Sequence, residues 1–273
     1  MIRLFTIEWL KLKNYKVFWI LLLLYSIGLI IACSGIIFLL RYIKNHGGDI
    51  FGIDPTILPI YDFPDVWHNL TYIATYFKLF LAFIVIISVN NEITYRTLRQ
   101  NIIDGLSKKE ALISKLTLIV SLSLVATIFL FLVSWVLGMF FSHVHGVQVV
   151  FREMEYLPAY FLEVCTFLSL AFLLSLLIKK SGFVIVLLFM YTLMFEPIAT
   201  AILEHYPKTP IVLKALVPYF PIKSLNNLIS IPYPKYVFLK IRDYVAWIDV
   251  LIVTGWLVVY NLLILLRLRI KDV

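Results

Sequence analysis

Lys78, Glu163 and Glu196 are ionisable residues that lie inside long apolar runs of the sequence. A charge in the hydrocarbon core of a membrane is costly unless it is paired or hydrated, so such side chains usually face a bundle interior or a cavity. At about 1.5 Å of helix per residue, they lie roughly 16, 22 and 20 Å from the inner ends of their helices, at or above the midplane of a ~30 Å core. We therefore expect Lys78 to pair with Glu163 or Glu196 in a cluster that lines or stabilises an outward-facing cavity. Snorkelling of Lys78 and Glu163 to the headgroups explains their positions equally well.

Pro197 follows Glu196 directly in the same apolar run. Proline lacks a backbone N–H, and its ring clashes with the carbonyl of the preceding turn. We therefore expect a kink in the outer half of this helix, at the depth of the ionisable residues.

A polar and basic segment interrupts the apolar sequence between residues 91 and 115. One helical face, at spacings i, i+3, i+7 and i+11, is formed by Tyr95, Leu98, Ile102 and Leu106. Gly105 suits the positive φ that often ends a helix. Ser107 and Glu110 have the spacing of a capping box that opens the next helix. The segment thus predicts a short amphipathic helix over 92–106, which lies on a membrane or in the groove of a partner.

The elements that position these residues are six apolar runs, each near the ~20 residues needed to cross a membrane. The chain is 62% hydrophobic and 15% charged, with a mean hydropathy of +0.96, which excludes an ordinary soluble domain. We predict an all-α integral membrane protein of one domain, residues 1–273, with six transmembrane helices. Their expected ranges are 18–40, 70–89, 116–141, 157–178, 183–203 and 247–266.

The net charge of +8 is explained by membrane topology and gives no support to nucleic-acid binding. Most of the 24 Lys and Arg residues fall in short segments that share one side when both termini are cytoplasmic, which agrees with the positive-inside rule. Residues 1–17 mix apolar and basic positions and predict an interfacial helix. Two pieces of the last outer loop, 211–217 and 222–230, are too short to span and could be re-entrant or interfacial helices.

No catalytic motif is present in the sequence, including the phosphate-binding loop of ATPases, the nucleophile elbow of hydrolases and the His-Glu-x-x-His zinc motif. His143 and His145 form a His-x-His pair on an expected outer loop, but a third ligand at a known spacing is missing. We expect no bound metal and no enzymatic activity. Cys33 and Cys165 lie within spans and are expected to pack as small apolar side chains.

The chain resembles the permease subunits of ABC-2 type ABC transporters. The similarity is carried above all by NNEITYRTLRQNIIDGLSKKEALISK, which looks like the segment that follows the second span in that family. The basic stretch before the first span, the turn LLIKKSG after the fourth span and the pair Glu196-Pro197 are also similar.

The resemblance implies a non-catalytic transport subunit, an exporter, in the cytoplasmic membrane of a bacterium. Two such permeases, identical or not, would pair with two cytosolic ABC ATP-binding subunits, which would use the ATP and Mg while this chain holds no cofactor. The segment 92–106 would be the coupling helix seated in a groove of the ATPase, a helix-in-groove mode of binding. The expected contact residues are Glu92, Tyr95, Arg96, Leu98, Arg99 and Ile102.

Two other classes remain open. An ion-coupled secondary transporter would use Glu163, Glu196 and Lys78, although the internal repeats common in such transporters are not apparent. An intramembrane enzyme would combine the His143 and His145 loop with the membrane carboxylates. A basic loop that only fixes topology is the simpler alternative to a coupling helix.

Overall fold

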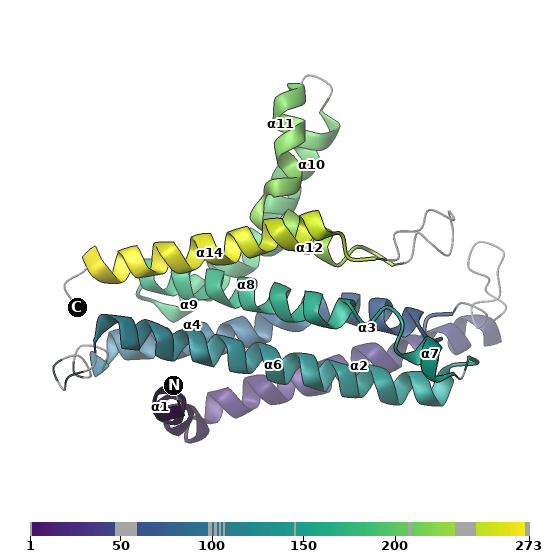
Figure 1. The fold of residues 1–273 in the computed structure, drawn as a ribbon, viewed down its shortest axis with the longest axis horizontal. Coiled ribbons are helices and arrows are strands. Elements are labelled where there is room, and N and C mark those ends of the chain that lie inside the picture. Colours follow the sequence, from purple (N-terminus) through teal and green to yellow (C-terminus); the bar gives the residue numbers. More distant parts are fainter. Residues whose placement is uncertain are drawn as a thin grey trace.

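A computed structural model shows, among the residues that it describes, six helices long and apolar enough to cross a membrane. The structure describes residues 2–46, 59–97, 100, 103, 105, 107–144, 146–206, 209–232 and 244–270. Within these ranges the regular structure is entirely helical. The helices run along one another in an elongated bundle with a projecting hairpin (Figure 1). The coarse prediction of an all-α multi-pass membrane protein is confirmed.

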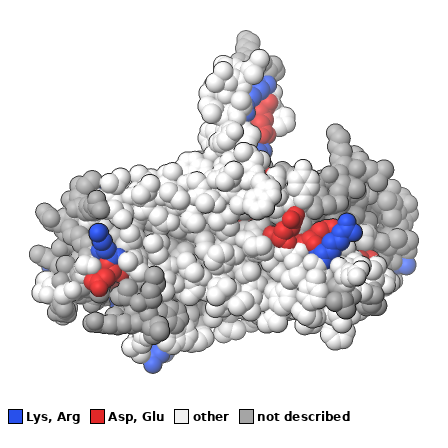
Figure 2. Space-filling view, in the orientation of Figure 1, with Lys and Arg blue, Asp and Glu red and all other residues white. Residues whose placement is uncertain are grey.

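The six candidate spans fall close to the apolar runs of the sequence. They are Lys16–Asn45, Asp65–Thr94, Lys109–Phe141, Tyr156–Leu177, Ser181–His205 and Trp247–Leu268. The second begins five residues earlier than predicted because Pro64 and Asp65 suit the first turn of a helix. Figure 2 shows charged side chains at the two ends of the bundle and on the hairpin, with a broad uncharged surface between them. This distribution fits a bundle surrounded by lipid.

The first half of the chain contributes four long elements to the bundle. The interfacial helix expected over 1–17 is α1 (Ile2–Lys13), which ends before Tyr15. It is followed by α2 (Lys16–Asn45), then by α3 (Asp65–Ala74), η2 (Thr75–Phe77) and α4 (Lys78–Thr94), which together make the second span. The third span is α6 (Lys108–Phe141). Gly138 of α6 faces Phe63 so closely that a Cβ there would lie 2.5 Å from the ring.

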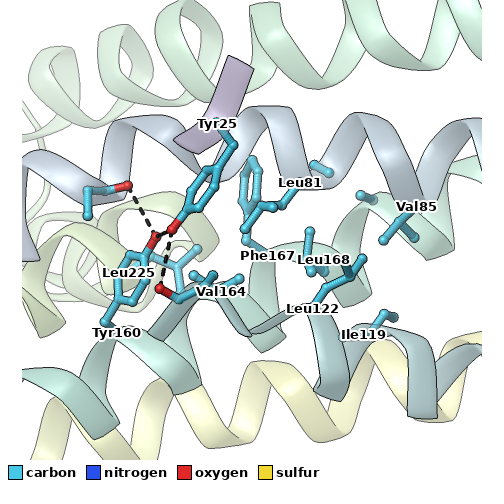
Figure 3. Close-up of a cluster of buried hydrophobic side chains, with 14 of the residues drawn as sticks. Tyr25, Leu81, Val85, Ile119, Leu122, Tyr160, Val164, Phe167, Leu168 and Leu225 are labelled. Atoms are coloured by element: carbon cyan, nitrogen blue, oxygen red, sulfur yellow. Dashed lines mark hydrogen bonds between the residues drawn. The ribbon is translucent and has the colours of Figure 1, made fainter. Parts of the chain in front are cut away.

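Helix α8 (Tyr156–Leu177) is the centre of the bundle and packs against α4, α6 and α14 (Trp247–Ile270). Tyr160 of α8 and Tyr25 of α2 share a hydrogen bond of 3.1 Å between their hydroxyl oxygens. Figure 3 shows this pair beside Val164, Phe167 and other apolar side chains of the core. The two hydroxyls therefore satisfy each other inside an apolar environment, where an unpaired one would be costly.

The fifth span changes direction near its middle. After α9 (Ser181–Met190), residues Tyr191–Phe195 form a π-helical turn, η3, and α10 (Glu196–His205) leaves the bundle (Figure 1). The missing N–H of Pro197 and its clash with the preceding turn explain why the regular α-helical ladder is interrupted here. The irregular turn lies just before Pro197, next to the position at which a kink was expected.

Short helices fill the connection between the fifth and sixth spans. These are α11 (Ile211–Leu216), η4 (Val217–Tyr219) and α12 (Pro221–Leu228), close to the predicted pieces 211–217 and 222–230. In Figure 1, α10 and α11 form the projecting hairpin, whereas α12 lies against α14 in the bundle. A four-residue helix, α7 (Val147–Val150), precedes α8.

Candidate functional site

Lys78 and Glu163 form a buried ion pair between α4 and α8, in which the Lys78 ammonium donates to Glu163 Oε1. Lys78 is 4% exposed and Glu163 is 0% exposed. The ammonium also lies 5.1 Å from the centroid of the Phe167 ring, within the range of a cation–π interaction. Of the two carboxylates considered from the sequence, Glu163 is the partner of Lys78.

Glu196 has a different role from the one expected, because its carboxylate caps α12. Oε1 accepts hydrogen bonds from the backbone N–H groups of Ile222 at 2.6 Å and Lys223 at 2.8 Å. These N–H groups belong to the first turn of α12, which has no intrahelical partners for them and attracts negative charge. Glu196 therefore fixes α12 to the start of α10, and Pro221 at the beginning of α12 supports this geometry.

A cavity of about 590 Å³ adjoins the ion pair, within the size range of small-molecule sites. Lys78, Glu163 and Pro197 line it, whereas Glu196 lines a smaller cavity of about 170 Å³. The two cavities share Pro197, Ile222, Lys223 and Asn226. The three ionisable residues are thus brought to one region, with Lys78 and Glu163 in direct contact and Glu196 across the first turn of α12.

Most of the polar wall of the larger cavity could not be identified from the sequence. It consists of residues from the second span, the π-helical turn, and α12 with the residues just after it, which are Tyr72, Thr75, Tyr76, Thr192, Lys223, Asn226, Asn227 and Ser230. Asn226 and Asn227, two adjacent amides in the amphipathic segment that forms α12, were the one hint of a polar site in the sequence. The sequence does not tell, however, which face of α12 packs against the bundle. Thr75 and Thr192 are unremarkable in helices of this kind.

Four charged residues near one end of the bundle form a second group, which we call the charge cluster: Glu8, Lys11, Glu92 and Lys115. They come from α1, α4 and α6. The Lys115 ammonium lies 2.7 Å from Glu8 Oε2 and 2.9 Å from Glu92 Oε1. The Lys11 ammonium lies 2.7 Å from Glu92 Oε1 and 3.5 Å from Glu8 Oε1. The alternating charges tie three helices together.

The charge cluster is largely buried and is supported by two neutral hydroxyl groups, one donor and one acceptor. Glu8 is 2% exposed, Lys115 4% and Glu92 8%. The Ser114 hydroxyl donates to Glu8 Oε1 at 2.9 Å, and Lys115 donates to the Ser88 hydroxyl at 3.1 Å. Buried charges are stable only when they are paired and hydrogen-bonded, and here both conditions hold.

The charges in the cluster change each other's affinity for protons. Burial by itself raises the pKa of Glu8, but Lys115 and Lys11 outweigh this effect and hold its pKa below the ordinary value. Burial likewise lowers the pKa of Lys11, yet Glu92 and Glu8 outweigh it and raise that pKa. Both groups are therefore held in their charged forms by their partners.

The comparison with known families gives one match. Residues 53–273 match the family DUF2705, a family of proteins of unknown function. This chain belongs to the DUF2705 family. No curated protein matches it. The match covers the cavity, Glu92 and Lys115, while Glu8 and Lys11 of α1 precede its first residue.

The segment after α4 of this DUF2705 chain differs in one respect from the helix expected over 92–106. Glu92 lies in the last turn of α4, and Tyr95 follows the end of that helix. Arg96 has a φ of 55°, a left-handed conformation that interrupts the helix. Gln100 then donates its N–H to Arg96 O at 3.1 Å, and Thr97, Gln100 and Ile103 are helical. Leu98, Arg99 and Ile102 lie outside the described residues.

The end of this segment agrees with the sequence prediction. Gly105 has a φ of 103°, which suits glycine because it lacks a Cβ. Glu110 N–H donates to Ser107 Oγ at 3.2 Å, and Ser107 N–H donates to Glu110 Oε2 at 2.8 Å. The predicted capping box at the start of α6 is therefore confirmed.

The candidate residues of the expected outer loop are not assembled into a metal site in the part of the chain that the structure describes. His143 contacts Asp62, with its backbone N–H 2.7 Å and its Nδ1 3.3 Å from Asp62 Oδ1. His145 lies outside the described residues. His143 therefore joins two connecting segments of the DUF2705 chain.

Proposed function

We propose that this chain is the membrane-spanning permease subunit of an ABC-2 type transporter. It moves substrate across the membrane by alternating access, driven by ATP hydrolysis in a separate ATP-binding subunit. In this proposal the chain is an exporter of the cytoplasmic membrane and pairs with a second permease copy or paralogue. ATP and Mg bind to the partner ATPase, and the chain itself is not an enzyme.

The observation that carries the proposal is the exposure of Tyr95 and Ile103, two described residues between α4 and α6. Tyr95 is 74% exposed and Ile103 is 75% exposed, so two large apolar side chains are presented outside the bundle. On either side of the segment, Glu92 and Lys115 are held in the charge cluster. Exposed apolar groups of this kind, next to residues held in a charge cluster, are suited to insertion into a groove of a partner.

The charge cluster supports the proposal through its position. It holds α1, the end of α4 and the start of α6 together, so a displacement of the segment would be passed to all three helices rather than absorbed by a loop. Tyr95 and Arg96 would contact the ATPase together with Leu98, Arg99 and Ile102. Glu92 would act by anchoring the segment.

Purification of the tagged full-length chain from its native membrane tests the proposal. We expect an ATP-binding protein to co-purify, with an ATPase rate that depends on the permease. Replacing both Leu98 and Ile102 by Asp should remove this dependence while membrane insertion is retained. The same double substitution at Ile211 and Val212, two exposed residues of the projecting hairpin, is the control. Purification without any ATP-binding protein, or unaltered coupling in the double variant, would contradict the proposal.

The buried Lys78–Glu163 pair beside a cavity favours one second candidate, an ion-coupled secondary transporter. In that case the pair would open during each cycle to bind and release an ion. Transport by liposomes that contain this chain alone, driven by an ion gradient, would favour this candidate. Transport that requires the ATP-binding subunit would exclude it.

A further inference from the structure

The ion pair beside the larger cavity is incompletely satisfied. Glu163 Oε1 accepts from Lys78, but Glu163 Oε2 is buried and has no hydrogen-bond partner among the described residues. Glu163 is completely buried and lines the cavity. A buried carboxylate oxygen without a donor is unfavourable, and such atoms call for a partner from outside the chain. The site is therefore suited to a ligand that donates a hydrogen bond.

The charges around the cavity balance, which limits the charge of such a ligand. Lys78 is neutralised by Glu163, and the Lys223 ammonium lies 2.9 Å from Glu204 Oε1. An anionic or cationic headgroup would find no unpaired counter-charge among the described residues that line the cavity. The cost of burying an uncompensated charge makes a charged ligand unfavourable there.

The neutral polar groups of the cavity wall can both donate and accept hydrogen bonds. Asn226 and Asn227 of α12 each offer an amide N–H₂ and a carbonyl oxygen. Ser230, which lies just after α12, and Thr75 of the second span, whose hydroxyl donates to Tyr72 O at 2.8 Å, also line the cavity. These wall residues are complementary to a ligand with amide or hydroxyl groups, because amide and hydroxyl groups likewise both donate and accept hydrogen bonds.

The remaining wall and the rim of the cavity are apolar. Leu79, Ile222 and Ile229 contribute to the wall. Leu193 and Ile231 also line the cavity and are 45% and 55% exposed, so they form part of its outer edge. In a chain surrounded by lipid, an apolar edge of this kind allows an alkyl chain to remain in contact with the membrane.

We propose that this cavity binds an amphipathic molecule with an uncharged amide or hydroxyl headgroup and an apolar chain. The headgroup donates to Glu163 Oε2 and exchanges hydrogen bonds with Asn226 and Asn227, while the apolar chain lies along Leu79 and Leu193. This inference deepens the proposed function, on which it rests, by naming the class of substrate.

Photo-crosslinking of the full-length chain in lipid nanodiscs tests the inference. The probes share one diazirine-bearing decyl chain and differ in headgroup: maltoside, dipeptide amide, phosphate or trimethylammonium. Mass spectrometry identifies the labelled residues, and decyl maltoside without the diazirine serves as the competitor. We expect the maltoside or the dipeptide amide to label Leu79, Leu193 or Ile231 in a competable manner, and the preferred one of the two tells whether the source is a glycolipid or a peptide. The two charged probes should label these positions at least about tenfold less.

Matched substitutions show whether the polar wall is responsible. Asn227→Leu should weaken competable labelling about five- to tenfold, the effect of losing one or two hydrogen bonds. Asn261→Leu is the control, because Asn261 is a half-buried residue of α14 outside this cavity. Glu163→Gln combined with Lys78→Met removes the ion pair without leaving a lone charge, and it should weaken labelling by the uncharged probes because the carboxylate that accepts the headgroup's hydrogen bond is gone. The two charged probes still find no counter-charge in this variant, so they should continue to label poorly.

Three results would overturn the inference: equal labelling by charged and uncharged probes, competable labelling only outside the cavity, or an equal loss in Asn227→Leu and Asn261→Leu. The experiment uses no ATPase, so its failure is distinguishable from failure of the proposed function. Cavity labelling together with a failure to co-purify any ATP-binding protein would retain the cavity site while rejecting the ABC assignment. A coupled ATPase without cavity labelling would do the reverse.

Discussion

Replacing Lys115 by Met is the sharpest test of the charge cluster. The cluster holds two negative and two positive side chains, and Lys115 contacts both carboxylates at 2.7 and 2.9 Å. Its removal leaves Glu8 and Glu92 buried with only Lys11 between them. Breaking a buried pair in this way typically destabilises a protein by about 3–5 kcal/mol. We expect a loss of this size in the free energy of unfolding.

A second substitution separates charge imbalance from lost packing. Adding Glu8→Gln to Lys115→Met leaves one carboxylate, Glu92, with one ammonium, Lys11, 2.7 Å away. Because the remaining charges balance, the double variant should be more stable than Lys115→Met alone. The coupling between the two positions is then of the order of 1–3 kcal/mol, as expected for residues in contact.

The assay is unfolding by SDS in mixed micelles, followed by circular dichroism of the full-length chain. Lys109→Met is the matched control, because Lys109 is exposed on the same helix and its replacement should change stability by no more than about 0.5 kcal/mol. Equal losses in Lys115→Met and Lys109→Met would refute the reasoning. So would a double variant whose loss equals the sum of the two single losses.

Three further outcomes follow from the geometry. The pKa of Glu8 is lower in the folded protein than its unfolded value of 4.5. Its contribution to stability is therefore present above pH 4.5 and is lost as the pH falls through the folded pKa. Glu8→Gln should reduce this loss of stability at acid pH, measured by SDS unfolding. Glu196→Ala should lower the free energy of unfolding by about 1–3 kcal/mol and accelerate amide hydrogen exchange at the start of α12. Glu196→Gln retains an acceptor oxygen and should have smaller effects. Equal exchange in the two variants would contradict the capping role. Gly105→Ala should destabilise the protein by about 1–3 kcal/mol through backbone strain, and Ser107→Ala by about 1 kcal/mol through loss of the helix cap. Faster proteolysis between α4 and α6 would show both effects. Gly182→Ala is the control, because Gly182 has open space around it.

Hydropathy was sufficient to place the six spans, because each consists of enough apolar residues to cross a membrane whatever its neighbours are. Local rules were equally informative at Gly105 and Ser107, where a single residue type determines the backbone conformation. Both kinds of signal are contained within a few consecutive residues. Their success therefore does not depend on how the helices pack.

Partners of buried charges could not be predicted in the same way. Depth along a helix placed Lys78, Glu163 and Glu196 at a similar level, but it does not give the direction in which each side chain points. The choice of Glu163 for Lys78 follows from the packing of α4 against α8. Glu8 and Lys115 are 107 residues apart, and their contact depends on how α1 folds back onto α6. No periodicity within either helix carries this information.

Helix α4 connects the two groups of charged residues. Lys78 begins it and Glu92 lies in its last turn, with uninterrupted α-helix between them. At about 1.5 Å per residue, the two positions are roughly 21 Å apart along one rigid element. A shift of α4 along its axis, or a tilt about its middle, that displaces Glu92 from Lys11 and Lys115 therefore also displaces Lys78 from Glu163. Under the proposed function, a partner pressing on the segment after α4 would act through this helix on the wall of the cavity. The Lys115→Met variant, which loosens one end of α4, should then change labelling in the cavity, whereas Lys109→Met should not.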